Sequence, residues 1–206
     1  VSCMFLMLLH TLSAQPASPL YQEAMKYKAR ENYAQTARLL RQVLDQDPQN
    51  TAVQAELGDA LYKNRSYFDA IPVYEQLLGA EDDNILYLAR LAEMYSMSPN
   101  KMKSVSYAER AAKLKPKDGE ILRSLGRTFL EIRHYPKAIK MYQEAEKVLP
   151  TDQDIPFRIA GCYTEMNDHG NAMKYYDRSL ELDPGNATKL YLTALCCYDL
   201  NNYNRA

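Results

Sequence analysis

Residues 119–152 read GEILRSLGRTFLEIRHYPKAIKMYQEAEKVLPTD, and this stretch decides the fold. Large apolar and small side chains recur in it at intervals of three, one and three residues, at Leu122, Leu125, Gly126 and Phe129. That spacing places them on one face of a helix. Further on, Pro150 cannot continue a helix, and the Asp152 carboxylate can accept hydrogen bonds from the N–H groups that open the next one. The stretch therefore predicts a helix, a tight turn, a second helix and a stop.

The same pattern returns every 34 residues between Ala17 and Ala206. When the sequence is written in rows of this length, the eighth and twentieth columns hold only small residues. The eighth column is Ala24, Gly58, Ala92, Gly126, Ala160 and Ala194. The twentieth column is Thr36, Ala70, Ser104, Ala138, Ala172 and Ala206. Small side chains at facing positions let the two helices of a hairpin approach closely. A fixed period of this length is typical of stacked repeats, which bury their apolar faces against one another.

The rows resemble the tetratricopeptide repeat family. The second row meets that family's pattern of large, small and aromatic positions at Leu57, Gly58, Leu61, Ala70 and Tyr74. The fourth row meets it at Leu122, Leu125, Gly126, Phe129, Ala138, Tyr142, Ala145 and Pro150. Glu23, Lys101 and Pro156 depart from the pattern, and the turn at residues 98–101 is expected to differ from the other turns. The resemblance implies an all-α fold, a right-handed α-solenoid of stacked antiparallel helix hairpins.

Each row is expected to form one hairpin of an array that covers residues 17–206. The complete repeats are 17–50, 51–84, 85–118, 119–152 and 153–186, followed by an incomplete repeat at 187–206. The last column of the rows is expected to cap the first helix of each following row, through Asn50, Asn84, Asp118, Asp152 and Asn186. Because the sixth row ends as its second helix begins, we expect the protein to continue beyond Ala206.

The first residues differ from the rest of the chain. Residues 3–12, CMFLMLLHTL, are apolar and are followed by SAQP at residues 13–16. This arrangement resembles the apolar region and small-residue cleavage site of a secretory signal peptide, with cleavage after Ala14. The stretch is shorter than the ~20 apolar residues that span a bilayer, so no membrane span is expected in the mature chain. The expected location is the periplasm or cell envelope. The alternative is an apolar helix packed on the first repeat of a cytoplasmic protein.

The composition argues against nucleic-acid binding and against catalysis. The formal net charge is -1, so no overall basic field attracts nucleic acid or anionic lipid. His134 and His169 have no acidic or thiol partner at a helical offset and are expected to be solvated residues in turns. Cys162 and Cys196 share a column in adjacent rows, which places them ~10 Å apart as buried thiols beyond disulfide reach. No phosphate loop, HExxH or GxSxG occurs. We expect no enzyme activity, no cofactor and no metal.

The remaining surface of the first helices offers candidate binding residues. Columns 2, 6, 9 and 13 line one helix face, with columns 5 and 12 at its edges. In the family that the chain resembles, this face lines a concave groove that holds peptides or partner helices. The candidate residues on it are Arg90, Arg123, Arg127, Phe157, Arg158 and Tyr191. The family's best-known carboxylate-binding arrangement is not reproduced here, because Thr188 and Leu192 stand at two of its positions.

Two interpretations of the arginines stay open. Arginine grips carboxylates with paired hydrogen bonds and stacks on aromatic rings, which favours a protein or peptide partner that is acidic or has a free C-terminal carboxylate. In the other interpretation, Arg123 and Arg127 only pair with Glu120 and Glu131 on their own helix. We expect a non-catalytic scaffold for protein–protein interaction. The alternative is a structural arm of a larger cell-envelope or secretion-assembly protein whose other domain lies beyond Ala206.

Overall fold

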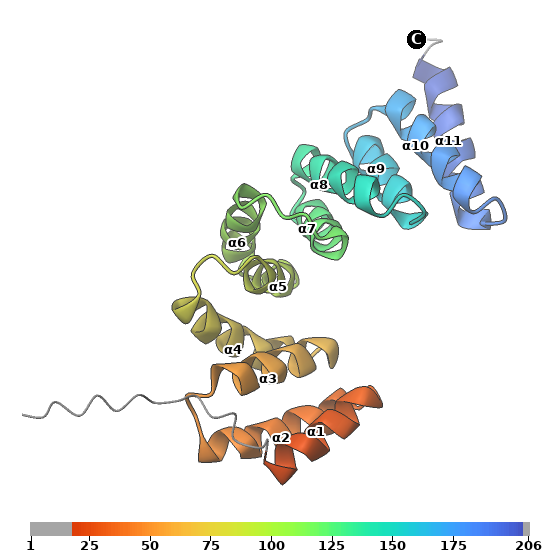
Figure 1. Ribbon diagram of the computed structural model, residues 1–206. Coiled ribbons are helices and arrows are strands. Elements are labelled where there is room, and N and C mark those ends of the chain that lie inside the picture. Colours follow the sequence, from red (N-terminus) through yellow and green to blue (C-terminus); the bar gives the residue numbers. More distant parts are fainter. Residues whose placement is uncertain (1–17, 204–206) are drawn as a thin grey trace, which may run out of the picture. The chain divides into compact units, whose positions relative to one another are not determined.

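A computed structural model describes residues 18–203, which form eleven helices and no strand (Figure 1). This part of the chain is all-α, as predicted. The helices are α1 (Pro19–Ala29), α2 (Tyr33–Gln46), α3 (Thr51–Lys63), α4 (Tyr67–Ala80), α5 (Ile85–Ser96), α6 (Lys101–Lys113), α7 (Gly119–Glu131), α8 (Tyr135–Val148), α9 (Asp154–Glu165), α10 (His169–Leu182) and α11 (Ala187–Tyr203). The predicted signal segment, residues 1–14, lies outside the described residues and stays a prediction.

The helices belong to two compact units that divide at Ala70 and Ile71, inside α4. In the first unit, α2 packs against both α1 and α3. In the second unit, α5 packs against α6, α7 against α8, and α9 against α10, while α10 also contacts α11. Neighbours along the chain are thus neighbours in space within each unit, as expected for hairpins whose apolar faces need partners.

The small columns lie where two helices meet. In the first five rows every residue of the eighth and twentieth columns is buried. In the third row the Ser104 hydroxyl on α6 donates to the Ala92 carbonyl on α5 at 2.7 Å, so the two columns touch. In the fourth row the space is tighter still, because a Cβ added to Gly126 would lie 2.7 Å from a ring atom of Tyr142. Glycine is required there by the ring that packs on it.

The predicted caps are present at four of the five positions. Asn50, Asn84, Asp118 and Asn186 each accept a backbone hydrogen bond from the residue three positions later. The fifth, Asp152, instead accepts from the N–H of Asp154 at 2.9 Å, and α9 begins one position later in its row than α3, α5 and α7 do in theirs. Pro156, which departs from the repeat pattern, therefore lies in the first turn of α9. The N–H groups of that turn have no partner within the helix, so the missing N–H of proline costs no helical hydrogen bond.

In four rows, the turn between the two helices of the hairpin contains a residue with left-handed backbone conformation, which the sequence pattern did not predict. Column 15 has a positive φ in four rows, at Glu31, Arg65, Arg133 and Asn167. The following N–H closes each turn, for example from His134 to the Phe129 carbonyl at 2.8 Å, as in a Schellman-type helix end. In the third row this column holds Pro99, whose ring fixes a negative φ. The expectation of a different turn at residues 98–101 therefore has a simple physical cause.

Ion pairs connect successive second helices at one repeated position. In each pair the partners are 28 residues apart, in columns 25 and 19 of adjacent rows. The pairs are Arg41 with Asp69 at 2.7 Å, Glu75 with Lys103 at 2.9 Å, and Glu109 with Lys137. In the first pair the earlier row supplies the cation, whereas in the other two it supplies the carboxylate. At the next junction Gln143, in column 25, instead donates to the Tyr175 hydroxyl, in column 23, at 3.0 Å. The ion pair between the same two second helices joins Arg178 and Glu146.

One expectation about histidine is wrong. His169 was expected to be solvated, but it is 9% exposed. His169 stands in the seventeenth column, which begins the second helix of the row and holds the half-buried Tyr33, Tyr67 and Tyr135 in three other rows. His134 is half-buried, with its ring stacked on Phe129 at 6.5 Å between centroids.

Candidate functional site

All six candidate residues lie on first helices of the second unit. Arg90 is on α5, Arg123 and Arg127 are on α7, Phe157 and Arg158 are on α9, and Tyr191 is on α11. Their exposure differs. Arg127, Arg158 and Tyr191 are exposed, whereas Arg90, Arg123 and Phe157 are half-buried. Their contacts, described next, separate side chains that hold the array together from side chains that face solvent.

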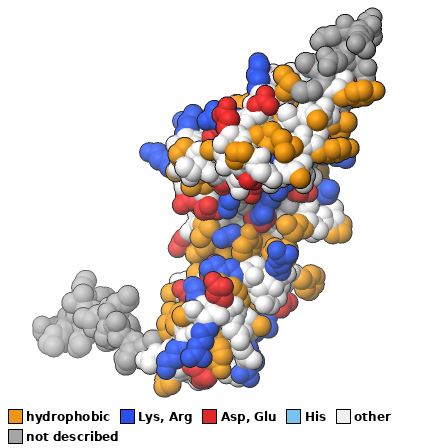
Figure 2. Space-filling model, turned by 90° about the vertical axis from the view of Figure 1, so that its right-hand side faces the viewer, with side chains coloured by type: hydrophobic (Ala, Val, Ile, Leu, Met, Phe, Trp, Pro, Cys, Tyr) orange, Lys and Arg blue, Asp and Glu red, His pale blue; other side chains and the backbone are white. Residues whose placement is uncertain are grey.

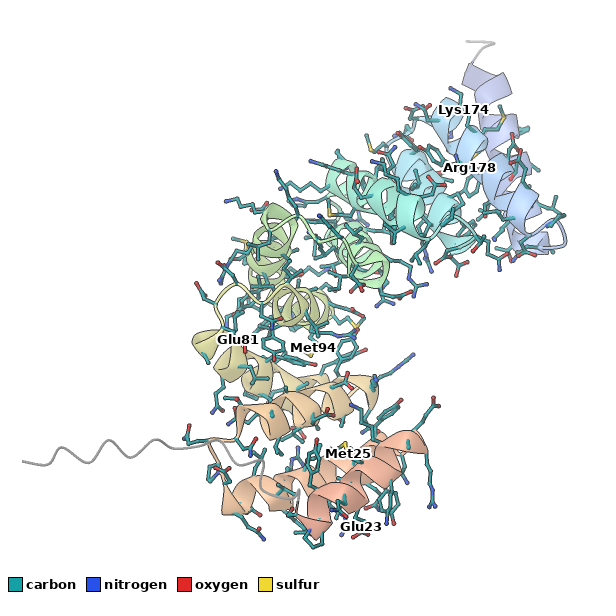
Figure 3. The ribbon with its side chains drawn as sticks, in the orientation of Figure 1. Glu23, Met25, Glu81, Met94, Lys174 and Arg178 are labelled. Carbon is teal, nitrogen blue, oxygen red and sulfur yellow. The ribbon has the colours of Figure 1, made fainter. Side chains whose placement is uncertain are left out.

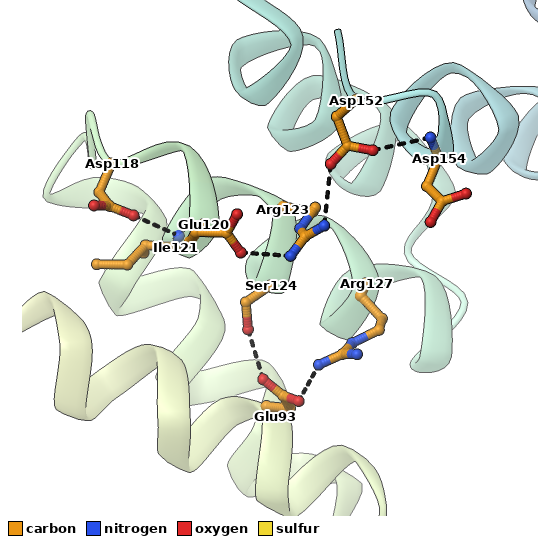
Figure 4. Close-up of polar contacts among 9 residues, drawn as sticks. All are labelled: Glu93, Asp118, Glu120, Ile121, Arg123, Ser124, Arg127, Asp152 and Asp154. Carbon is orange, nitrogen blue, oxygen red and sulfur yellow. Dashed lines mark hydrogen bonds and ion pairs between the residues drawn. The ribbon is translucent and has the colours of Figure 1, made fainter. Parts of the chain in front are cut away.

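Arg127 is bound to a buried carboxylate (Figure 4). Its guanidinium forms an ion pair with Glu93 on α5, whose side chain is only 3% exposed. The Ser124 hydroxyl donates to the other oxygen of the same carboxylate at 2.7 Å. Glu93 is thus satisfied entirely from α7, and the pair joins two neighbouring rows. The predicted pairing of Arg127 with Glu131 on its own helix is wrong, because the carboxylate one row earlier is the partner.

Arg123 has two carboxylate partners of its own (Figure 4). It pairs with Glu120 one turn earlier on α7, as predicted, and with Asp152 at 3.0 Å. Although partial burial opposes the charged form, these carboxylates raise the pKa of the Arg123 guanidinium above its usual value. The second partner was not predicted. Since Asp152 also accepts from the first N–H of α9, Arg123 helps to fix the start of that helix.

Arg158 differs from both arginines of α7. It is exposed, and among the described residues no carboxylate pairs with it. Phe157, beside it, is half-buried, because its ring packs at 5.7 Å from that of Tyr176. The ammonium of Lys189 on α11 lies 5.9 Å from the centroid of the Phe157 ring. Phe157 therefore belongs largely to the packing between α9, α10 and α11, and Arg158 is the side chain of this pair that faces solvent.

An apolar stripe runs along α11. Tyr191 is 66% exposed, Leu195 is 42% exposed and Tyr198 is 65% exposed. Intervals of four and three residues place them on one face of the helix. Figure 2 shows hydrophobic side chains gathered at the upper end of the drawn surface, which α10 and α11 form. Leu195 was not named as a candidate, although column 9 of the sixth row lies on the predicted face.

We call the exposed side chains of these helices the first-helix surface, which consists of Arg127, Arg158, Tyr191, Leu195 and Tyr198. Several other charged side chains of the second unit are paired within the protein. For example, Arg178 on α10, labelled in Figure 3, lies 3.0 Å from Glu146 on α8. The first-helix surface thus combines an unpaired cation with large exposed apolar side chains.

A metal site and a reactive thiol have little support in residues 18–203. No group of three or more metal-ligating side chains occurs among them. Cys162 and Cys196 are buried, and burial raises the pKa of the Cys162 thiol to about 12, so this thiol stays protonated at neutral pH. Over the same residues, no helix has the length and apolar character needed to cross a bilayer.

Sequence comparison finds two family profiles in different parts of the chain. The profile described as "Tetratricopeptide repeat" matches residues 27–94. The profile described as "Anaphase-promoting complex, cyclosome, subunit 3" matches residues 145–206. No curated protein sequence matches the chain.

Solved structures of similar fold include MamA and YrrB. The structure titled "Crystal structure of MamA protein" is 20% identical, with a TM-score of 0.69, covering 82% of this chain and 92% of that one. The structure titled "Crystal structure of YrrB: a TPR protein with an unusual peptide-binding site" is 15% identical, with a TM-score of 0.70, covering 88% of this chain and 94% of that one. At these identities the likeness concerns the fold. Together with the helix hairpins, it shows a fold of stacked tetratricopeptide-like hairpins, and the matched profile identifies residues 27–94 as tetratricopeptide repeats.

Proposed function

We propose that the chain is a non-catalytic scaffold that binds a segment of a partner protein on its first-helix surface. The observation that carries this proposal is Arg158, an exposed guanidinium on α9 without a carboxylate partner among the described residues. The next first helix, α11, carries the exposed apolar stripe. Arginine and tyrosine are frequent anchors of protein interfaces. The description of YrrB as a protein with a peptide-binding site supports the same use of this fold.

The charge of Arg158 indicates the chemistry of the partner. A guanidinium can donate two parallel hydrogen bonds to one carboxylate, and such charge-assisted bonds are stronger than neutral ones. We therefore propose that the bound segment is acidic or ends in a free carboxylate. Arg123 and Arg127 contribute less to this binding than Arg158, because their guanidinium groups are held by internal carboxylates.

A random peptide library panned against the immobilised protein tests this function. Selected peptides should bind roughly tenfold or more weakly to the double variant Arg158→Glu, Tyr191→Ala, as measured by fluorescence anisotropy. A matched control changes the exposed Lys140 on α8 and Met102 on α6, as Lys140→Glu, Met102→Ala. That control removes the same kinds of side chain from second helices and should leave the affinity unchanged. Equal affinity of both double variants would contradict the proposal.

We also propose that the protein is exported to the periplasm or cell envelope. The support is the apolar run of residues 3–12 followed by small residues at 13–14. N-terminal sequencing of the protein from its host should find Gln15 as the first residue. Recovery of an uncleaved protein from the cytosolic fraction would exclude export.

A further inference from the structure

The side chain of Tyr142 on α8 ends in a hydroxyl to which no group of residues 18–203 hydrogen-bonds. The residue is 1% exposed, and its ring packs on Gly126 of α7, where an added Cβ would lie 2.7 Å from a ring atom. Buried tyrosine hydroxyls usually have a partner. The buried Tyr95, for example, donates to Glu75 at 2.8 Å. The Tyr142 hydroxyl is therefore a donor whose acceptor is missing from the described chain.

This hydroxyl lies near two arginines of the first-helix surface. The helix that carries it, α8, packs against both α7 and α9. On α7, the ring covers Gly126, which directly precedes Arg127. Burial raises the pKa of Tyr142, whereas the guanidinium groups of Arg158 and Arg127 act in the opposite direction, so both lie within electrostatic range of the phenol. The side chain therefore extends from the packing between helices toward the surface that these arginines form.

The charges around this hydroxyl favour an added acceptor. Arg127 is neutralised by Glu93, whereas Arg158 has no carboxylate partner among the described residues. Glu131 also lies within electrostatic range of Tyr142, but no hydrogen bond joins the two side chains. The Tyr142 oxygen is not among the enclosed polar atoms that lack a partner, so it touches solvent. A donor that lacks an acceptor thus lies near an arginine that lacks a carboxylate.

We propose that the Tyr142 hydroxyl and the Arg158 guanidinium form a subsite for one carboxylate of a bound peptide. This inference rests on the proposed function and adds a residue that determines its specificity. The guanidinium supplies the charge, and the hydroxyl donates a hydrogen bond to one carboxylate oxygen. The carboxylate belongs to an Asp or Glu side chain or to the C-terminus of the peptide. Because a hydrogen bond to a charged acceptor is stronger than one to a neutral acceptor, the subsite favours a carboxylate over a carboxamide.

Random peptide libraries with amidated and with free C-termini provide the probe. The amidated library offers only side-chain carboxylates, and the free one adds a terminal carboxylate, so the two libraries distinguish the sources. A selected peptide should bind Tyr142→Phe roughly tenfold or more weakly than the unchanged protein, because the variant lacks only the hydroxyl. When the carboxylate of that peptide is replaced by a carboxamide, the unchanged protein and Tyr142→Phe should bind it with nearly equal affinity.

Tyr95→Phe is the matched control. It removes a buried hydroxyl that is hydrogen-bonded within the protein, so it should lower the melting temperature and leave peptide affinity unchanged. Tyr142→Phe should do the reverse, because no internal hydrogen bond is lost. If Arg158→Glu weakens the selected peptides but Tyr142→Phe does not, the subsite is overturned and the proposed function stands. If neither library yields a peptide that depends on Arg158, both are overturned.

Discussion

Replacing Phe129 by alanine lowers the free energy of unfolding by about 3–5 kcal/mol. The Phe129 ring is 1% exposed and lies at the end of the apolar face of α7. Truncation removes its transfer free energy and leaves a cavity between helices that are already in close contact, where Gly126 and Tyr142 leave no slack. Urea unfolding followed by circular dichroism at 222 nm, a wavelength that reports helix, measures the change.

The exposed Phe68 supplies the matched control. It is the same residue type at 92% exposure, so Phe68→Ala should change the free energy of unfolding by less than about 0.5 kcal/mol. Because repeats contact mainly their neighbours, hydrogen exchange in Phe129→Ala should accelerate most in α7 and α8 and least in α1 and α2. Similar urea midpoints for the two variants would show that the fourth row is not packed as described.

Replacing Arg127 by methionine destabilises the protein by about 2–3 kcal/mol. The physical reason is Glu93, which keeps its buried position but loses its cation. Breaking a buried pair by removal of one partner costs about 3–5 kcal/mol, and the remaining hydrogen bond from Ser124 offsets part of that cost. The methionine retains most of the apolar packing of the arginine stem, so the loss reports the charge.

Two further variants test this explanation. Arg158→Met removes an exposed arginine without a described carboxylate partner, and its stability should change by less than about 0.5 kcal/mol. Adding Glu93→Leu to Arg127→Met removes the stranded carboxylate and should recover most of the lost stability. If the second substitution instead deepens the loss, Glu93 is not the cause. The three measurements also distinguish an arginine that holds two rows together from one that is available to a partner.

The hairpins could be predicted from the sequence because their determinants are local and repeated. Small residues at columns 8 and 20, and Asn or Asp in the last column, act within one row or at its boundary, so each is visible in every row. Arg127 shows where prediction from local sequence fails. Glu131, four residues later on the same helix, was its predicted ion-pair partner, but the stacking of α5 on α7 brings Glu93, 34 residues away, into reach.

The left-handed turn residues were missed for a different reason. Column 15 contains Glu31, Arg65, Arg133 and Asn167, and only asparagine adopts positive φ with much frequency. The backbone hydrogen bonds of the turn determine the conformation at this column, and they do not require a particular residue type.

The ion pairs between second helices make the copies of the repeat unequal under duplication and loss. Loss of residues 51–84 would bring Arg41 opposite Lys103, two cations, at the position where each now has a carboxylate. Loss of residues 85–118 would bring Glu75 opposite Lys137, a pair of opposite sign. A gene that shortens by one whole repeat is therefore better tolerated at the third repeat than at the second. The signs of these six side chains therefore indicate which repeats can be removed or joined by design.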